Sequence, residues 1–244
     1  MEEIAIFALV GILIGFSKGG LGGPVPVALT VPMLSLILET QIAVALVVPL
    51  LIFADVFALY IYWKQWDYQY IKLMLLPGLI GVLVGTLVLN DIDTVTLNRI
   101  VGGLTLLALA FKVTSDRLAS LKYAPRNWHG CFAGWASGFG STLANVGAPP
   151  FTAYLLLQPT MTPLKFVGTT TLFFAVMNLT KAPGYLIIGL IDIDRLLSIA
   201  WVFLLIPPAV LLARYLIDHI NQQVFEWLMM APLAVLSLHL LFFS

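Results

Sequence analysis

Long apolar segments alternate with short polar segments along the whole chain. A helix needs about 20 residues to span a membrane. Five apolar segments are this long, namely residues 41–63, 70–89, 163–190, 196–217 and 224–243. Residues 98–113 form a shorter segment of the same kind. This pattern predicts an all-α polytopic protein, whose helices cross a lipid bilayer several times.

Two apolar regions differ from the rest, because a polar, glycine-rich break interrupts each of them. Residues 4–16 and 24–38 flank the first break, and residues 128–143 and 149–158 flank the second. Each of these pieces is too short for a comfortable span. Irregular backbone at membrane depth is tolerated only where it lines a cavity or is covered by protein. We therefore expect each pair to form either one broken helix or a re-entrant hairpin that meets near the midplane.

The two breaks resemble each other, which indicates an internal duplication. The first reads GILIGFSKGGLGGPVP from Gly11 and the second reads GWASGFGSTLANVGAPP from Gly134, so that G-x-x-x-G-F recurs with a shift of 134 − 11 = 123. Interrupted segments at corresponding places in two halves point to a transporter's binding site. The sequence predicts two transmembrane repeats of about four helices each, residues 1–113 and 128–244, joined by a connector at residues 114–127.

The charges of the loops indicate an orientation in the membrane. The stretch from Lys112 through Arg117 and Lys122 to Arg126 is the most basic segment. Because cytoplasmic loops collect Lys and Arg, it places the connector inside. Hairpins at both breaks would place most of the remaining basic loops on the same side as this cytoplasmic connector. They would also make the halves inverted repeats with both termini outside. A single span at the second break would reverse the second half and obey the rule less well.

The composition supports a membrane protein and narrows its partners. Hydrophobic residues make up 61% of the chain and charged residues 10%, whereas soluble domains are roughly 45–50% apolar and about 25% charged. The formal net charge is zero, so nucleic acid is not expected as a partner. The single cysteine, Cys131, and the isolated histidines suggest no metal site, and we expect no cofactor. The lipid bilayer is the expected surrounding, and the sequence leaves a homo-oligomer open.

The motifs of the breaks resemble a known family. GFSKGGLGG in the first half, with GFGSTLANVGAPPFTAYLLLQ and KFVGTTTLFFAVMNLTK in the second, is similar to the sulfite exporter TauE/SafE family. The resemblance covers nearly the whole chain. It implies a multi-pass permease of a bacterial-type inner membrane. Its implied substrates are small sulfur-containing anions such as sulfite, sulfoacetate and other organosulfonates.

The first break supplies the sharpest candidate for an anion site. Lys18 is a cation inside the break, and intramembrane ionisable residues usually face a cavity or a partner. Pro24 suits the first position of a half-helix, whose free N–H groups and positive dipole end favour an oxyanion. The alternative is that Lys18 snorkels to the lipid headgroups. The candidate residues here are Ser17, Lys18, Gly19, Gly20, Gly22 and Gly23.

The second break and the segment after it supply neutral polar groups and another lysine. The candidate residues here are Ser141, Thr142, Asn145, Gly147, Thr171, Asn178 and Lys181. Asp55 aligns with Asn178 in the first half. It could pair with Lys18 or Lys181, or carry a coupling proton. For the G-x-x-x-G pairs Gly11/Gly15, Gly81/Gly85 and Gly134/Gly138, we favour close packing of helices over a role in binding.

The function that this pattern predicts is a secondary transporter that works by alternating access around the paired breaks. The chain has no G-x-x-x-x-G-K-[ST] motif, so the energy would come from a gradient or from the membrane potential. A passive anion channel is the alternative within transport. Gly15 to Gly19 also match G-x-S-x-G, so an intramembrane serine hydrolase is a second alternative. That motif requires a strand before the serine, and the flanking sequence is typical of helix, so we expect no enzyme.

Overall fold

The computed structural model describes residues 2–119, 125–216 and 219–243, and every regular element in them is a helix. The helices in chain order are α1 (Glu2–Gly19), α2 (Val25–Leu34), α3 (Thr40–Ile61), α4 (Tyr68–Asp91), α5 (Thr94–Ala119), α6 (Asn127–Ala144), α7 (Ala148–Leu156), α8 (Pro163–Ile187), α9 (Ile193–Ser198), α10 (Ala200–Phe203), α11 (Ile206–Leu216) and α12 (Gln222–Phe242). The predicted all-α fold is confirmed.

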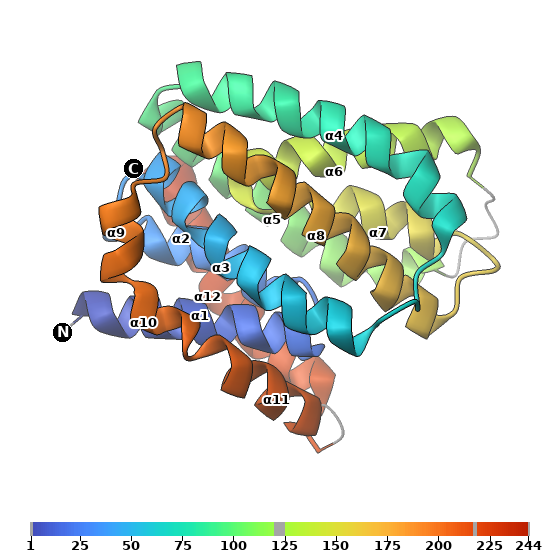
Figure 1. Cartoon of the computed structure of the whole chain (residues 1–244). Coiled ribbons are helices and arrows are strands. Elements are labelled where there is room, and N and C mark those ends of the chain that lie inside the picture. The colour runs from blue at the N-terminus through green and yellow to red at the C-terminus, as the bar shows by residue number, and fades with distance from the viewer. Residues whose placement is uncertain (1, 120–124, 217–218, 244) are drawn as a thin grey trace.

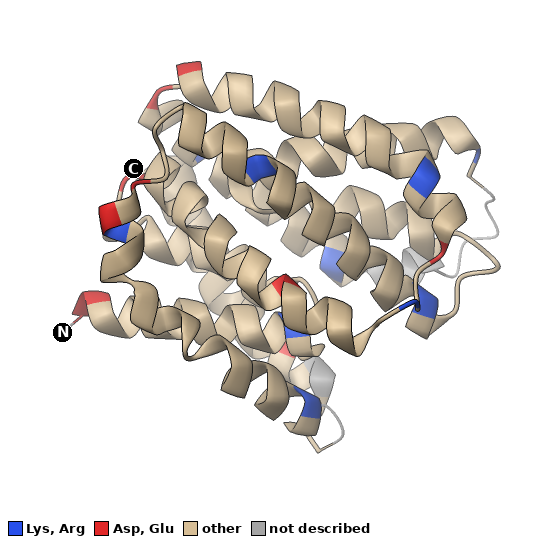
Figure 2. Cartoon of the chain, in the orientation of Figure 1, with Lys and Arg blue, Asp and Glu red and all other residues tan. Residues whose placement is uncertain are grey.

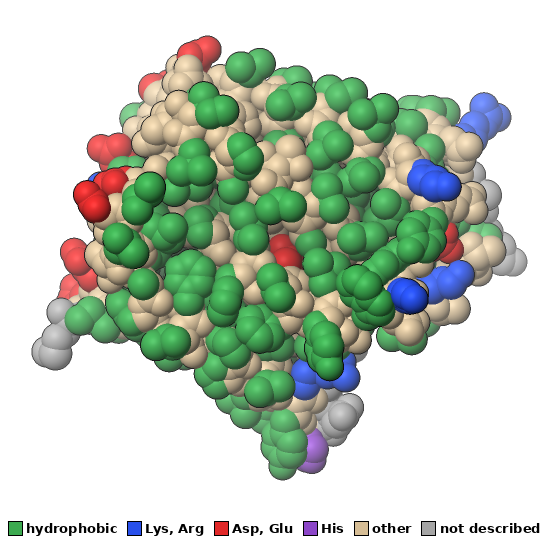
Figure 3. Space-filling model, viewed as in Figure 1, with side chains coloured by type: hydrophobic (Ala, Val, Ile, Leu, Met, Phe, Trp, Pro, Cys, Tyr) green, Lys and Arg blue, Asp and Glu red, His purple; other side chains and the backbone are tan. Residues whose placement is uncertain are grey.

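Four helices among the described residues are long and apolar enough to cross a membrane. They are α3, α4, residues Thr94–Thr114 of α5 and residues Val224–Phe242 of α12. α8 has the length, but polar side chains such as Asn178 and Lys181 lower its hydropathy, and it is not one of the four. Figure 3 shows apolar side chains across the middle of one face, with charged side chains mainly at its two ends. The chain is therefore a polytopic membrane protein.

Both breaks form hairpins. In Figure 1, α1 runs away from the end of the bundle that holds both termini, and α2 returns toward it. α7 likewise folds back along α6: a Cβ on Gly130, near the start of α6, would lie 2.8 Å from Cζ of Tyr154, which is near the end of α7. A Cβ on Gly147 would lie 2.3 Å from the carbonyl oxygen of Ser137. The chain therefore reverses at each break.

Glycines allow α1 to pack closely on α11 and α6 to pack closely on α4. A Cβ on Gly15 would lie 2.5 Å from Cβ of Ala209, and a Cβ on Gly138 would lie 2.0 Å from the carbonyl oxygen of Gly78. Contacts this short leave no room for a side chain. The remaining glycines of the three G-x-x-x-G pairs meet similar obstacles, at Gly11, Gly81, Gly85 and Gly134. The packing interpretation of these pairs is confirmed.

The apolar segment at residues 196–217, predicted to span the membrane, is not one continuous helix among its described residues. The chain there is divided among α9, α10 and α11, with turns at residue 199 and at residues 204–205. Pro207 and Pro208 lack the N–H groups that a continuous helix would need at this point. The backbone instead tightens, and the N–H of Leu205 donates to the carbonyl of Val202 (3.0 Å).

α3 lies at the centre of the bundle, and its residues Val44 to Val48 are fully buried. It packs against α1, α2, α5 and α8. α5 continues to Ala119, beyond the predicted end at residue 113, and so includes the first part of the predicted connector. The remainder of that connector includes residues 120–124, which lie outside the described residues.

The two ends of the bundle differ in charge. Figure 2 shows acidic residues gathered at the end that holds both termini and basic residues mainly at the opposite end. We call these the acidic end and the basic end. At the acidic end, the acidic residues at or beside helix ends are Glu2 and Glu3 (start of α1), Glu39 (before α3), Asp91 (end of α4), Asp93 (before α5), and Asp192 and Asp194 (start of α9, which also contains Arg195). The basic residues near the opposite helix ends are Lys64 (after α3), Lys72 (α4), Arg126 (before α6), Lys165 (α8) and Arg214 (end of α11).

Candidate functional site

A cavity of about 440 Å³ lies between the two hairpins, and residues of both breaks form its wall. Most of the candidate residues line it, namely Ser17, Lys18, Gly20, Gly23, Ser141, Asn145, Gly147, Thr171 and Asn178. The structure thus brings the two breaks, which are far apart in the sequence, to one site.

The remaining candidates lie outside the cavity wall. Gly19 packs on α11, because a Cβ there would lie 2.5 Å from Cβ of Ala213, and Gly22 packs against the ring of Phe225. The hydroxyl of Thr142 donates to the carbonyl of Gly138 (2.9 Å) within α6. Asp55 and Lys181 are buried behind the wall, and each contacts residues that line it.

Lys18 forms an ion pair with Asp55, which lies on α3. The Lys18 side chain is 14% exposed, and that of Asp55 is 3% exposed. Lys18 therefore turns into the protein rather than out to the headgroups. The other carboxylate oxygen of Asp55 accepts a hydrogen bond from Nδ2 of Asn178 on α8 (2.7 Å). The pairing expected for Asp55 is thus present, and it joins α1, α3 and α8.

The backbone of the first break has a conformation that favours glycine. Gly20, Gly22 and Gly23 have φ values of 101°, 76° and 57°, a region in which a side chain is penalised. The hydroxyl of Ser17 donates to the carbonyl of Gly23 and so closes the turn. Because this hydroxyl bonds to a carbonyl and Lys18 pairs with Asp55, neither side chain activates the other as a hydrolase dyad would require.

The second break is held by Asn145 and Lys181. Asn145 is the C-cap of α6 in a left-handed conformation (φ 53°). Its Nδ2 donates to the carbonyl of Val44 on α3 (3.1 Å). Nζ of Lys181 donates to Oδ1 of Asn145 (2.7 Å), to Oγ of Ser141 (3.1 Å) and to the carbonyl of Ser141 (3.2 Å). The break is therefore fixed to both α3 and α8.

Two half-helices begin at the cavity. Pro24 is the N-cap of α2, and Gly147 is the N-cap of α7. Both N-caps line the cavity, together with Val25 and Ala148. A helix N-terminus carries the positive end of the helix dipole, which favours a negatively charged group. Backbone donors are few at both ends, because Pro26, Pro149 and Pro150 have no N–H and the N–H of Val25 donates to the carbonyl of Gly22 (3.3 Å). The N-terminal ends of α2 and α7 therefore add to the positive potential that the lysines create in the cavity.

The charges at the centre of the bundle do not cancel. With each side chain counted in its usual ionised form, Lys18 and Lys181 contribute +2 and Asp55 contributes −1, so the formal sum is +2 − 1 = +1. A net charge away from water is costly unless an opposite charge joins it. The arrangement is therefore suited to holding an anion.

The cavity wall also contains a charged pair that sequence reasoning missed. Nζ of Lys112 on α5 lies 2.8 Å from Oε2 of Glu226 on α12, and both residues line the cavity. The sequence pattern places Lys112 with the basic connector and does not single out Glu226. A carboxylate inside the apolar segment at residues 224–243 is the signal that could have identified the pair.

The cavity extends toward the basic end. Tyr62 at the end of α3, Leu156 at the end of α7 and Phe166 near the start of α8 line it there. Fully buried apolar residues of α3, such as Val44 and Val48, fill the space toward the acidic end. The wall contains further apolar side chains between these limits, including Val27, Leu51, Val167, Phe174 and Leu233.

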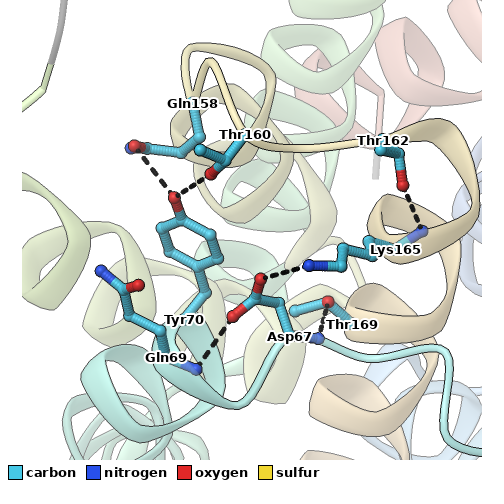
Figure 4. Close-up of polar contacts among 8 residues, drawn as sticks. All are labelled: Asp67, Gln69, Tyr70, Gln158, Thr160, Thr162, Lys165 and Thr169. Atoms are coloured by element: carbon cyan, nitrogen blue, oxygen red, sulfur yellow. Dashed lines mark hydrogen bonds and ion pairs between the residues drawn. The ribbon is translucent and has the colours of Figure 1, made fainter.

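A group of polar contacts at the basic end connects the α3–α4 loop and the start of α4 to the α7–α8 loop and the start of α8 (Figure 4). Asp67 pairs with Lys165 (3.2 Å), and its N–H donates to the hydroxyl of Thr169 (2.8 Å). The hydroxyl of Tyr70 lies within hydrogen-bonding distance of Gln158 (3.3 Å) and Thr160 (3.2 Å). Because the α3–α4 loop belongs to the first half of the chain and the α7–α8 loop to the second, these contacts join the halves at the basic end.

The described residues contain no group of three or more His, Cys, Asp or Glu side chains that could hold a metal ion. The polar groups that reach the cavity are the ammonium groups of Lys18 and Lys112, hydroxyls, amides and the carboxylate of Glu226, which pairs with Lys112. The ammonium, hydroxyl and amide N–H groups can donate hydrogen bonds to an anion.

Comparison with known proteins agrees with the resemblance noted from the motifs. A family model described as Sulfite exporter TauE/SafE matches residues 7–240. The match spans both hairpins and every helix that lines the cavity. No curated protein and no solved structure matches the chain.

Proposed function

The chain belongs to the sulfite exporter TauE/SafE family of membrane transporters, and from this premise we propose that it carries a small sulfur-containing anion by alternating access around its two hairpins. The observation that carries the proposal is the single cavity that both breaks line, with Lys18 in its wall. The anion would lie against Lys18, Asn178 and the N-terminal ends of α2 and α7. The proposed role is transport and not catalysis.

The size and lining of the cavity favour an organosulfonate over sulfite. Its volume of about 440 Å³ falls in the range of roughly 300–1,000 Å³ that is typical of sites for small organic molecules. Phe166, Val167 and Phe174 give it apolar walls away from Lys18. A sulfonate group can meet the polar end while an organic body contacts these walls. Sulfite, which is polar on every side, would leave them uncovered.

The duplication gives the proposal its mechanism. α1 packs on α11 as α6 packs on α4, and these pairs are equivalent if the second half repeats the first. We infer inverted repeats, with the basic end in the cytoplasm of a bacterial-type inner membrane. The cavity of this structure would then face the cytoplasm. Exchange of the conformations of the two halves would open the same site to the other side.

Counterflow in proteoliposomes tests the proposal and separates a carrier from a channel. Labelled sulfoacetate and labelled sulfite are supplied outside, with and without unlabelled sulfoacetate inside. A carrier shows uptake that saturates and that internal sulfoacetate accelerates, and we expect sulfoacetate to be the better substrate. Uptake that neither saturates nor responds to internal anion would overturn the carrier in favour of a channel. Uptake no faster than in empty liposomes for every anion would overturn the function.

A further inference from the structure

Lys181 is a fully buried cation that contacts no carboxylate within ion-pair distance. Its relative exposure is 0%. The ion pairs between described residues are Lys18–Asp55, Lys112–Glu226 and Lys165–Asp67, and Lys181 belongs to none of them. Its ammonium instead donates to the hydroxyl and carbonyl oxygens of Ser141 and to the amide oxygen of Asn145. Lys181 thus differs from Lys18, which has a carboxylate partner and reaches the cavity.

The oxygens around Lys181 are ligands of the kind that bind a small hard cation. Carbonyl, hydroxyl and amide oxygens are suited to such ions. Ser141 lies in the last turn of α6, and this end of the helix carries the negative end of its dipole. In secondary transporters with broken helices, the C-terminal ends of half-helices and unwound carbonyls coordinate the coupling cation. The ammonium therefore lies where such an ion would be expected.

The chain prepares these oxygens independently of Lys181. The N–H of Asn145 donates to the carbonyl of Ser141 (3.0 Å), which fixes the end of α6. Nδ2 of Asn145 donates to the carbonyl of Val44, which leaves Oδ1 turned toward the ammonium. Ser141 and Asn145 also line the cavity. The two residues that bind the ammonium therefore also face a solute in the cavity.

We propose that the oxygens of Ser141 and Asn145 form a monovalent-cation site that Lys181 permanently occupies. The ammonium takes the place of a dissociable ion such as Na⁺, and it holds the second hairpin in its bent form. The proposal goes beyond anion transport. The wild-type protein therefore binds no stabilising Na⁺ at this site.

Chemical rescue tests the site. Lys181→Ala removes the side chain beyond Cβ, and n-propylammonium replaces the missing atoms. We expect n-propylammonium chloride to raise the melting temperature of purified Lys181→Ala by roughly 3 °C or more above its value in tetramethylammonium chloride. Tetramethylammonium is the matched salt, because it has the charge but no N–H to donate. Lys181→Met fills the space with an apolar chain and should show no such difference, and neither should the wild type.

Ser137→Ala is the control for a change in the same helix. Ser137 lies one turn before Ser141, is fully buried, and its hydroxyl has no hydrogen-bond partner among the described residues. Adding Ser137→Ala to Lys181→Ala should leave the response to n-propylammonium unchanged. Adding Ser141→Ala or Asn145→Ala should abolish it, because these changes remove the proposed ligands. Equal melting of Lys181→Ala in the two salts would overturn the proposal.

A measurement on the wild type decides the matter if Lys181→Ala does not fold. The melting temperature of the wild type should be the same in NaCl and in choline chloride. A higher melting temperature in NaCl would overturn the proposal. No arm of this experiment contains an anionic substrate. Rescue of Lys181→Ala without any anion transport would support the cation site and reject the transport function. Anion transport by the wild type, without rescue of Lys181→Ala by n-propylammonium, would reject the cation site and leave the transport function standing.

Discussion

Asp55 accepts a hydrogen bond from Asn178 at a distance of 2.7 Å, and the two residues are 178 − 55 = 123 positions apart. The same shift relates Gly11 to Gly134, so residues that the duplication makes equivalent contact each other. A contact between equivalent positions is expected next to a twofold axis. It supports the inferred inverted repeats and places the Lys18–Asp55–Asn178 contacts at the junction of the halves.

Exchanging the two side chains tests this contact. Asp55→Asn removes the charge that pairs with Lys18, and loss of one partner of a buried pair costs about 3 kcal/mol or more. The double variant Asp55→Asn with Asn178→Asp returns a carboxylate to the same hydrogen bond. We therefore expect its free energy of unfolding to be higher than that of Asp55→Asn alone, as measured by denaturation in detergent.

Asn178→Ala is the control for the exchange, because it removes the amide and leaves the ion pair. It should cost less than Asp55→Asn. A double variant that is no more stable than Asp55→Asn would contradict a shared site for the carboxylate.

The packing glycines can be tested against a glycine with space around it. Gly138→Ala would place Cβ 2.0 Å from the carbonyl oxygen of Gly78, and such overpacking costs about 1–3 kcal/mol. Gly103 lies in α5, and no atom lies within 4 Å of the position that a Cβ would take there. Gly103→Ala should be neutral or slightly stabilising, because Ala is the better helix former. Thermal melting of both variants measures the difference, and equal melting temperatures would refute close packing of α4 and α6.

The glycines of the breaks divide into structural and cavity positions. A Cβ on Gly22 would lie 2.7 Å from the ring of Phe225, whereas the nearest atom to a Cβ on Gly23 is Oε1 of Glu226 at 3.9 Å. Gly22→Ala should therefore lower stability. Gly23→Ala has room for the Cβ, but its φ of 57° penalises a side chain, so it should also cost stability, though less than Gly22→Ala. Because it narrows the cavity, Gly23→Ala should in addition weaken anion binding. Measuring both properties on each purified variant decides the point, and unchanged binding by a folded Gly23→Ala would remove this glycine from the site.

The apolar pattern predicted the long helices and both breaks because it depends on local sequence. Residues 24–38 and 149–158 were too short to span a membrane, and their Gly-Pro starts fixed where α2 and α7 begin. The interruption of the apolar segment at residues 196–217 was not predicted, because apolar content alone does not register the hydrogen bonds that Pro207 and Pro208 remove.

The sequence predicted the polar residues of the site, but it left open which of them contact each other. The sequence offered Asp55 either Lys18 or Lys181, and the choice depends on how α1, α3 and α8 pack. Lys181 was predicted to bind substrate, and the structure instead places it behind Ser141 and Asn145. The helical pattern predicts which residues of α8 share a face, but it does not predict which helix packs against that face.

The orientation can be tested with cysteines at the two ends of the bundle. Cys131 is the only cysteine of the chain, so Cys131→Ser gives a background without thiols. Gln65→Cys lies in the α3–α4 loop at the basic end, and Asn90→Cys lies at the end of α4 near the acidic end. Both positions are exposed. A membrane-impermeant thiol reagent should label Asn90→Cys in intact cells and Gln65→Cys only after permeabilisation. The opposite pattern would contradict a cytoplasmic basic end.

The most direct test of the account is anion binding by wild type, Lys18→Gln and the double variant Lys18→Gln with Asp55→Asn, measured by calorimetry with sulfoacetate. The double variant keeps the charges balanced, so it controls for an unpaired Asp55. Lys165→Gln is the matched control, because Lys165 pairs with Asp67 outside the cavity. We expect both Lys18 variants to bind at least about tenfold more weakly than wild type, with Lys165→Gln unchanged. Wild-type affinity in folded Lys18 variants would contradict an anion site at the two breaks.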